Sequence, residues 1–503
     1  MRPSQNRVDV EAGQIAWTRD LARDLFPAAV TPFHWTLLRR PAQEAMRRTW
    51  ADLGVALPAA DFWRRAPDGT VYLNADLVAQ AGRAVHGAAW LGAPPGGPPP
   101  PELGGLLGRW QTPGTIKRAQ AQVDAVAQEA DGLNLRLAEW FAFVQRLRWT
   151  QADLLQVMEE LEPRAQTILQ AYFALRASLS AAQAEVTGRL TEWLPGCPPQ
   201  TILHLYAGLD GLPSVEVAYA LAALRNASNQ DAAVQNFLAR YGHRGPGEMR
   251  PDARRWREHA DLAMQLAALP LAHDVEAARA ARQAAEEWVL GRLDGNQRRQ
   301  FEPLLARARR LCRAVDVAWD GLARVMAGAQ LWLRAVAAVA VSAGLIADAA
   351  EVSFLELEEL KQVATGEWHG GRSERVREEV VQRRADLAAC PDEPSRPPLA
   401  ASPGTTSGPA FRLEPPGDAV LLPGAVVLTR VAAPGDAPYW LSAAAVIDAA
   451  GDPWAPGMIV ARALAVPAVT GMPGPVAQVA PGHIIAVDGS AGRVEIESPI
   501  PLA

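Results

Sequence analysis

The side chains best suited to chemistry lie together in one short segment. Within Phe-Leu-Ala-Arg-Tyr-Gly-His-Arg-Gly-Pro-Gly-Glu, which begins at Phe237, stand His243, Arg244 and Glu248. A guanidinium binds a carboxylate or a phosphate through two parallel hydrogen bonds, so this segment predicts a pocket for an anionic substrate. The same residues also fit a buried turn in which His243 and Arg244 tie two helices together. Both interpretations stay open at this point.

No other set of residues indicates a reaction. Cys197, Cys312 and Cys390 are too far apart for a CxxC motif, and their odd number favours a reducing cytoplasm. The remaining histidines lack Cys, His or carboxylate partners at metal-ligand spacing, so we expect no metal and no cofactor. His483 follows Pro481-Gly482 and is interpreted as a turn residue.

The overall charge excludes partners that bind by electrostatic attraction to a basic protein. Lys plus Arg is 49 and Asp plus Glu is 55, which gives a net charge of −6. We therefore expect no nucleic acid and no membrane among the partners. The beginning of the sequence has no apolar signal segment, and the apolar stretch near 331–346 is interpreted as a buried helix.

The sequence divides into two regions that differ in composition and in hydrophobic pattern. Up to about residue 390, Ala-, Leu- and Glu-rich stretches with apolar residues three and four apart predict a large helical domain, residues 1–390, with breaks at Pro270, Pro303 and Gly245-Pro246. Residues 391–410 are rich in Pro, Ser, Thr and Gly and predict a flexible linker, and 93–101 is a second Pro-rich break.

Beyond the linker, short apolar runs bounded by Gly and Pro predict buried strands, and one helix is expected at 457–465. The strand candidates are 419–422, 425–428, 443–447, 468–469, 484–487 and 493–496. The predicted fold class is α plus α/β: a large, mainly helical domain followed by a small mixed domain, residues 411–503.

Four ordered segments resemble phosphoenolpyruvate-utilising enzymes, especially the phosphoenolpyruvate synthase and rifampicin phosphotransferase group. They begin at Trp17-Thr18-Arg19, at Gly69-Thr70-Val71, at Phe237, and at Ile459-Val460-Ala461-Arg462. The resemblance implies a substrate-binding central domain and a swivelling β/β/α phosphohistidine-type mobile domain. It also extends the predicted substrate-binding set of His243, Arg244 and Glu248 to Arg462.

In that family, an ATP-grasp domain phosphorylates a histidine of the mobile domain, which then rotates to the substrate. The segment before Trp17 is shorter than the about 50 residues that a domain needs, so we expect no ATP-grasp domain in this chain. Alignment on Ile459-Val460-Ala461-Arg462 places Pro456 at the histidine position, Ala455 at the serine and Asp452 at the second glycine. Proline offers no nucleophile, so no catalytic residue is predicted.

The resemblance and this substitution together predict a pseudoenzyme. We expect a degenerate family member that binds a small molecule, hydrophobic or anionic, or a partner protein. The alternative is one subunit of a split phosphotransferase that works with a separate ATP-grasp chain. The sequence does not decide whether the chain is an enzyme.

Overall fold

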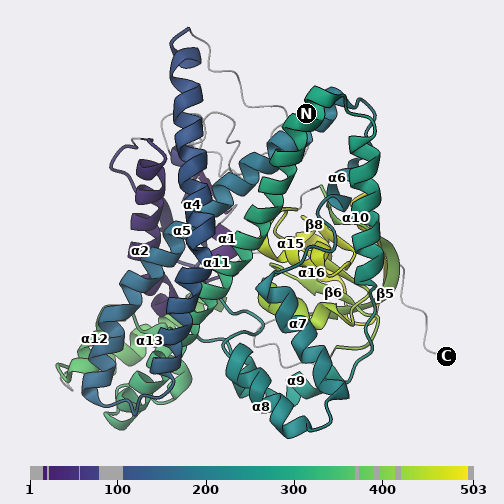
Figure 1. The fold of residues 1–503 in the computed structure, drawn as a ribbon. Coiled ribbons are helices and arrows are strands. Elements are labelled where there is room, and N and C mark those ends of the chain that lie inside the picture. The colour runs from purple at the N-terminus through teal and green to yellow at the C-terminus, as the bar shows by residue number, and fades with distance from the viewer. Residues whose placement is uncertain are drawn as a thin grey trace.

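The computed structural model describes residues 15–19, 22–55, 57–78, 106–368, 373–388, 397–413 and 421–496. The predicted Pro-rich break at 93–101 lies outside these residues. Long helices occupy one side of the molecule, and a sheet drawn in yellow-green lies against the shorter helices on the other side (Figure 1). This arrangement confirms the predicted α plus α/β class.

The helical part is built around long helices that pack along one another. α2, α4 and α11 all lie against α5. The α-helices are α1 (Ala22–Leu25), α2 (Pro32–Asp52), α4 (Leu106–Val144), α5 (Gln151–Trp193), α6 (Pro199–His204), α7 (Pro213–Ala223), α8 (Gln230–Tyr241), α9 (Ala260–Ala267), α10 (Val275–Leu290), α11 (Gly295–Ser342), α12 (Leu357–Thr365) and α13 (Ser373–Ala388). The 3-10 turns are η1 (Leu224–Asn226), η2 (Trp256–Glu258) and η3 (Ala349–Phe354).

α11 is the longest helix and forms the centre of this packing. It contains Pro303, so the predicted break at this residue is wrong. Proline removes one backbone hydrogen bond, but packing against α4 and α5 keeps the helix continuous. α11 is long and apolar enough to cross a membrane, with a window of mean hydropathy 1.5, yet 61% of that window is buried inside the protein. This burial is typical of a core helix, as the sequence indicated.

Two sheets complete the described part of the fold. A small antiparallel sheet near the N-terminus has the order β1-β3-β2, with β1 (Trp17–Thr18), β2 (Trp63–Arg65) and β3 (Val71–Asn74). The C-terminal sheet has the order β10-β9-β5-β6-β7-β8-β4. Its strands are β4 (Leu399–Ser402), β5 (Thr405–Arg412), β6 (Val426–Thr429), β7 (Ala445–Asp448), β8 (Ala468–Thr470), β9 (Ile484–Asp488) and β10 (Arg493–Ile496). η5 (Pro434–Asp436), α14 (Ala437–Trp440), α15 (Pro456–Ala463) and α16 (Pro473–Gln478) lie between these strands in the sequence.

The sheet begins earlier in the chain than the sequence indicated. Residues 391–396 of the predicted linker lie outside the described residues, but Leu399–Ser402 and Thr405–Arg412 are strands, so a linker up to residue 410 is wrong. Gly408 and Pro409 suggested a linker by composition. In the sheet, a Cβ on Gly408 would collide with the Gly424 carbonyl, and Pro409 lies just before β5 begins to pair with β6. Both residues therefore fit the close packing of strands in the sheet.

The predicted strand at 419–422 is also wrong in its described part, Leu421 and Leu422.

The sheet packs directly on the helical part. α14 and α15 lie against α7, α15 also contacts α11, and one hydrophobic core runs from the long helices into the sheet. The backbone N–H of Ala272 donates to the carbonyl of Leu441 at 2.8 Å, which joins the two parts outside the core. The C-terminal sheet is therefore docked against the helices.

Candidate functional site

Pro456 is the first residue of α15 and is buried. Proline suits this position because its φ angle is already helical and the first turn needs no N–H from it. The next residue, Gly457, lies so close to the Ala432 carbonyl that a Cβ would collide with it. Position 456 thus lies at a tightly packed helix start and carries no group that could accept a phosphoryl group.

The segment just before α15, residues 451–455, contacts the helical part through one buried arginine. Arg176 of α5 donates to the Asp452 carboxylate at 2.8 Å and to the carbonyl of Trp454 at 3.0 Å. It also donates to Asp24 at 3.3 Å, and its side chain is only 1% exposed. Arg23 reaches the carbonyl of Ala450 at 2.8 Å. Asp452 thus takes part in an ion pair between the two parts of the protein.

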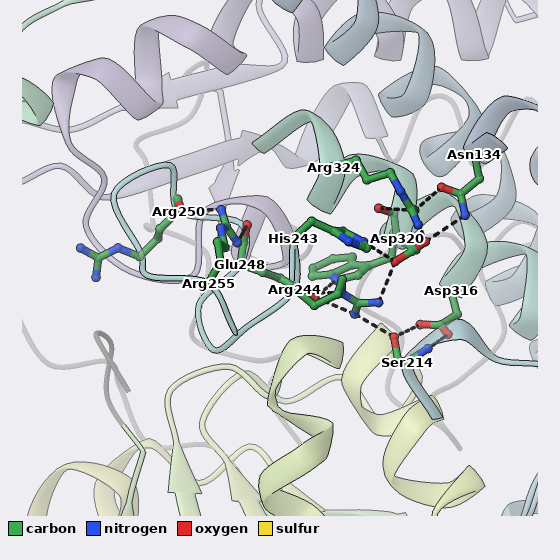
Figure 2. A network of polar contacts seen from close by, with 11 residues as sticks. Asn134, Ser214, His243, Arg244, Glu248, Arg250, Arg255, Asp316, Asp320 and Arg324 are labelled. Carbon is green, nitrogen blue, oxygen red and sulfur yellow. Dashed lines mark hydrogen bonds and ion pairs between the residues drawn. The ribbon is translucent and has the colours of Figure 1, made fainter. Parts of the chain in front are cut away.

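His243, Arg244 and Glu248 form one buried network with two carboxylates of α11 (Figure 2). Arg244 donates to both Glu248 oxygens at 2.6 and 2.9 Å, and to Asp320 at 3.0 Å. The His243 ring contacts the same Asp320 oxygen at 2.9 Å. Asp316 accepts from the Ser214 hydroxyl at 2.6 Å, which connects α7 to α11. Asn134 of α4 at 2.9 Å and Arg324 also bind Asp320.

The electrostatics of this network fix its charge states. Burial, and next Arg324, lower the pKa of His243 to about 4, so the imidazole is neutral at pH 7. Burial alone would raise the pKa of Asp320, but Arg324 and His243 hold it well below its ordinary value. Burial raises the pKa of Asp316 to about 6, an effect that Arg244 partly offsets. Asp320 is therefore ionised at pH 7, and its carboxylate is the shared partner of the surrounding side chains.

These positions match the second interpretation of the segment, in which His243 and Arg244 tie helices together. Gly247, with φ +65, lies in the turn between Arg244 and Glu248 and adopts a conformation that favours glycine. Asp316 and Asp320 were not among the predicted site residues, although two carboxylates four residues apart in an apolar helix were the available signal. That His243, Arg244 and Glu248 bind substrate stays a prediction.

Arg462, the fourth predicted substrate-binding residue, lies in α15, away from these three. Its side chain is fully buried, and its Cζ lies 4.2 Å from the centre of the Trp454 ring. One nitrogen, Nη1, donates to the carbonyls of Ala401 and Pro453. Its role in substrate binding also stays a prediction.

A cavity of about 340 Å³ lies between the helical part and the C-terminal sheet. The 246–250 turn forms part of its wall, and the 429–436 segment forms another part. Its lining residues are Asp24, Pro27, Ala28, Ala29, Pro246, Gly247, Met249, Arg250, Leu387, Leu413, Thr429, Arg430, Val431, Ala433 and Asp436. The volume and the mixed apolar and polar lining are typical of a small-molecule site.

The two arginines of this cavity differ. Arg250 is held by Asp252 through contacts of 3.1 and 2.8 Å. Arg430 is exposed and has no hydrogen-bond or ion-pair partner in the part of the chain that the structure describes. Arg430 is therefore the cation of this cavity that is available to a ligand. No group of three or more His, Cys, Asp or Glu among the described residues could hold a metal ion.

Asp436, in the cavity wall, gives the protein a pH-dependent stability. Burial raises its pKa to about 8, although the Ala433 N–H donates to the carboxylate at 3.0 Å. A raised native pKa means that the native state binds the proton more tightly than the unfolded state, so this stability is lost as pH rises from about 4 to about 8. In Asp436→Asn the neutral amide replaces the protonated acid. We expect the free energy of unfolding of the variant, relative to the unmodified protein, to rise across that window in urea denaturation. A constant difference between pH 4 and pH 8 would contradict this prediction.

Two family models match the chain. The rifampicin phosphotransferase fourth domain matches residues 190–315, which include His243, Arg244 and Glu248. The mobile domain of PEP-utilising enzymes matches residues 421–492, which include Pro456 and Arg462. A search of curated proteins found no match. The two matched segments lie in the docked parts described above and in the expected order, and both matches support a phosphoenolpyruvate-utilising, rifampicin phosphotransferase-like family.

Proposed function

We propose that this chain is a degenerate member of its family that carries no phosphate at position 456 and binds a small molecule between its two parts. The observation that carries the proposal is Pro456, a buried residue without a nucleophilic atom at the start of α15. Phosphoryl transfer through a histidine needs an imidazole nitrogen that can attack phosphorus. The histidine route known in the family has no acceptor at this position.

The contacts of residues 451–455 support the same proposal. A domain that carries phosphate must leave one site and reach another, whereas Arg176 holds Asp452 and the Trp454 carbonyl against α5. Asp452 stands where the family has a glycine, and a glycine could not form this ion pair with Arg176. Substitution at this position therefore adds a contact that favours the docked arrangement.

The cavity beside Arg430 supports a small ligand as the partner. Its apolar wall, which includes Met249 and Leu413, would cover the body of the ligand, while the guanidinium of Arg430 would bind an anionic group. We propose a small amphipathic molecule with a carboxylate or phosphate group. The free cysteines Cys197 and Cys312 support a reducing cytoplasm as the location.

The test is a search for phosphohistidine in the purified full chain. After incubation with ATP or with phosphoenolpyruvate, we expect no acid-labile phosphate on the protein by phosphate-affinity electrophoresis and mass spectrometry. Detection of phosphohistidine would refute the proposal. Phosphorylation that requires a co-purified ATP-grasp chain would establish the alternative, a split phosphotransferase.

A second arm of this test measures ligand binding by thermal unfolding against small amphipathic carboxylic acids and phosphate esters. A ligand that binds only the native state raises the midpoint. Arg430→Gln and Ala28→Trp, which remove the cation and fill the cavity, are expected to lower the response. Arg493→Gln, an exposed arginine on β10, is the matched control. Equal responses in all variants would exclude the cavity as the binding site.

A further inference from the structure

Arg462 has one edge of its guanidinium without an acceptor. Its Nε and Nη2 have no hydrogen-bond partner among the residues that the structure describes, and the side chain is fully buried. These two nitrogens lie on the same edge of the planar group. They therefore form the fork with which arginine binds two oxygens of one oxyanion.

Other buried arginines of the chain use this same edge for carboxylates. Arg244 directs Nε and Nη2 to the two oxygens of Glu248. Arg176 directs them to Asp24 and Asp452. No ion pair joins Arg462 to a described carboxylate, although a buried charge without a counter-ion is strongly unfavourable. The face of Trp454 offsets part of that cost and leaves the edge of the guanidinium open.

The Tyr206 hydroxyl is a second donor beside the same aromatic ring. It is buried and has no hydrogen-bond partner in the described part of the chain. The Tyr206 ring lies 5.0 Å from the Trp454 ring, and Trp454 in turn covers Arg462. Burial raises the pKa of Tyr206, so the hydroxyl keeps its proton. The Arg462 guanidinium and the Tyr206 ring thus both pack against Trp454, and each side chain carries a donor without an acceptor among the described residues.

We propose that the Nε and Nη2 edge of Arg462, with the Tyr206 hydroxyl beside it, binds a small oxyanion, either a carboxylate or inorganic phosphate. The site joins the two parts of the protein, because Tyr206 follows α6 while Arg462 lies in α15. The Gly208 N–H already donates to the Arg462 carbonyl at 3.0 Å. An anion at this place stabilises the docked C-terminal sheet. This site is separate from the cavity of the proposed function, whose lining contains neither residue.

The experiment compares anions at constant ionic strength. The full chain is unfolded and refolded in a chloride buffer free of carboxylate and phosphate, and inorganic phosphate or formate is then added before thermal unfolding. We expect a rise of the midpoint that saturates with phosphate or with formate, and the anion with the lower half-saturation concentration identifies the ligand class. Tyr206→Phe should raise that concentration about fivefold through loss of one donor.

Arg462→Met removes the fork but keeps a long apolar side chain beneath Trp454, so we expect a folded protein whose midpoint no longer responds to either anion. Arg493→Gln, an exposed arginine of the same sheet, should respond as the unmodified protein does. An equal rise in Arg462→Met, or no saturating rise in the unmodified protein, overturns the proposal. If Arg462→Met fails to fold, an unchanged half-saturation concentration in Tyr206→Phe overturns it.

Discussion

Asp320→Asn is expected to lower the free energy of unfolding by about 3 to 5 kcal/mol, the typical cost of removing one partner from a buried ion pair. Asp320 accepts hydrogen bonds from Arg244 at 3.0 Å and Asn134 at 2.9 Å, and it also binds Arg324. The asparagine amide has nearly the same shape, but it removes the negative charge that compensates two guanidinium groups. Urea denaturation at pH 7 measures the loss.

The matched control is Asp131→Asn. Asp131 also forms a two-contact pair with an arginine of α11, Arg313, but its side chain is 57% exposed. We therefore expect less than about 1 kcal/mol for this variant. Similar losses in Asp131→Asn and Asp320→Asn would mean that the buried network contributes no more than a surface pair.

The sequence predicted the parts of the fold that depend on local pattern. The helix expected at 457–465 is α15, and five of the six strand candidates contain or overlap a strand. β4 and β5 were missed because residues 391–410 are rich in Pro, Ser, Thr and Gly, which are turn and linker residues by composition. For Gly408 in β5, the close approach of the 424 backbone explains the glycine. Local composition gives no information on a contact between Gly408 and a backbone segment that is distant in the sequence.

The same limit applies to the candidate site. The sequence identified His243, Arg244 and Glu248 as a group, since they lie close together in the chain. It did not identify Asp320 or Ser214, because α11 and α7 meet the 243–248 turn only in the folded protein. Nor did it reveal that Asp452 pairs with Arg176, which is more than 270 positions away. Partners in a buried ionic network are set by packing between helices, and one sequence contains no direct record of them.

Arg176→Met is the second variant for which we expect a large effect, again about 3 to 5 kcal/mol at pH 7. Without Arg176, the buried carboxylate of Asp24 keeps the Tyr172 hydroxyl at 2.7 Å but loses its guanidinium partner. Burial already raises the pKa of Asp24, so the variant is expected to protonate it readily. The loss should therefore shrink as pH falls, because a neutral acid needs no counter-ion. Urea denaturation at several pH values measures this trend.

Two further variants separate the buried charge from the contact between the two parts. Arg176→Met with Asp24→Asn removes both buried charges, so we expect it to recover most of the lost stability. Asp452→Asn leaves the Asp24 pair intact and changes a side chain that is 40% exposed, so its loss should stay below about 1 kcal/mol. Limited proteolysis measures how firmly the C-terminal sheet is held against α5. If the ion pair with Arg176 contributes to this contact, Asp452→Asn should speed cleavage within the sheet. Cleavage at the unmodified rate would show that the ion pair between Asp452 and Arg176 has no part in holding the sheet against α5.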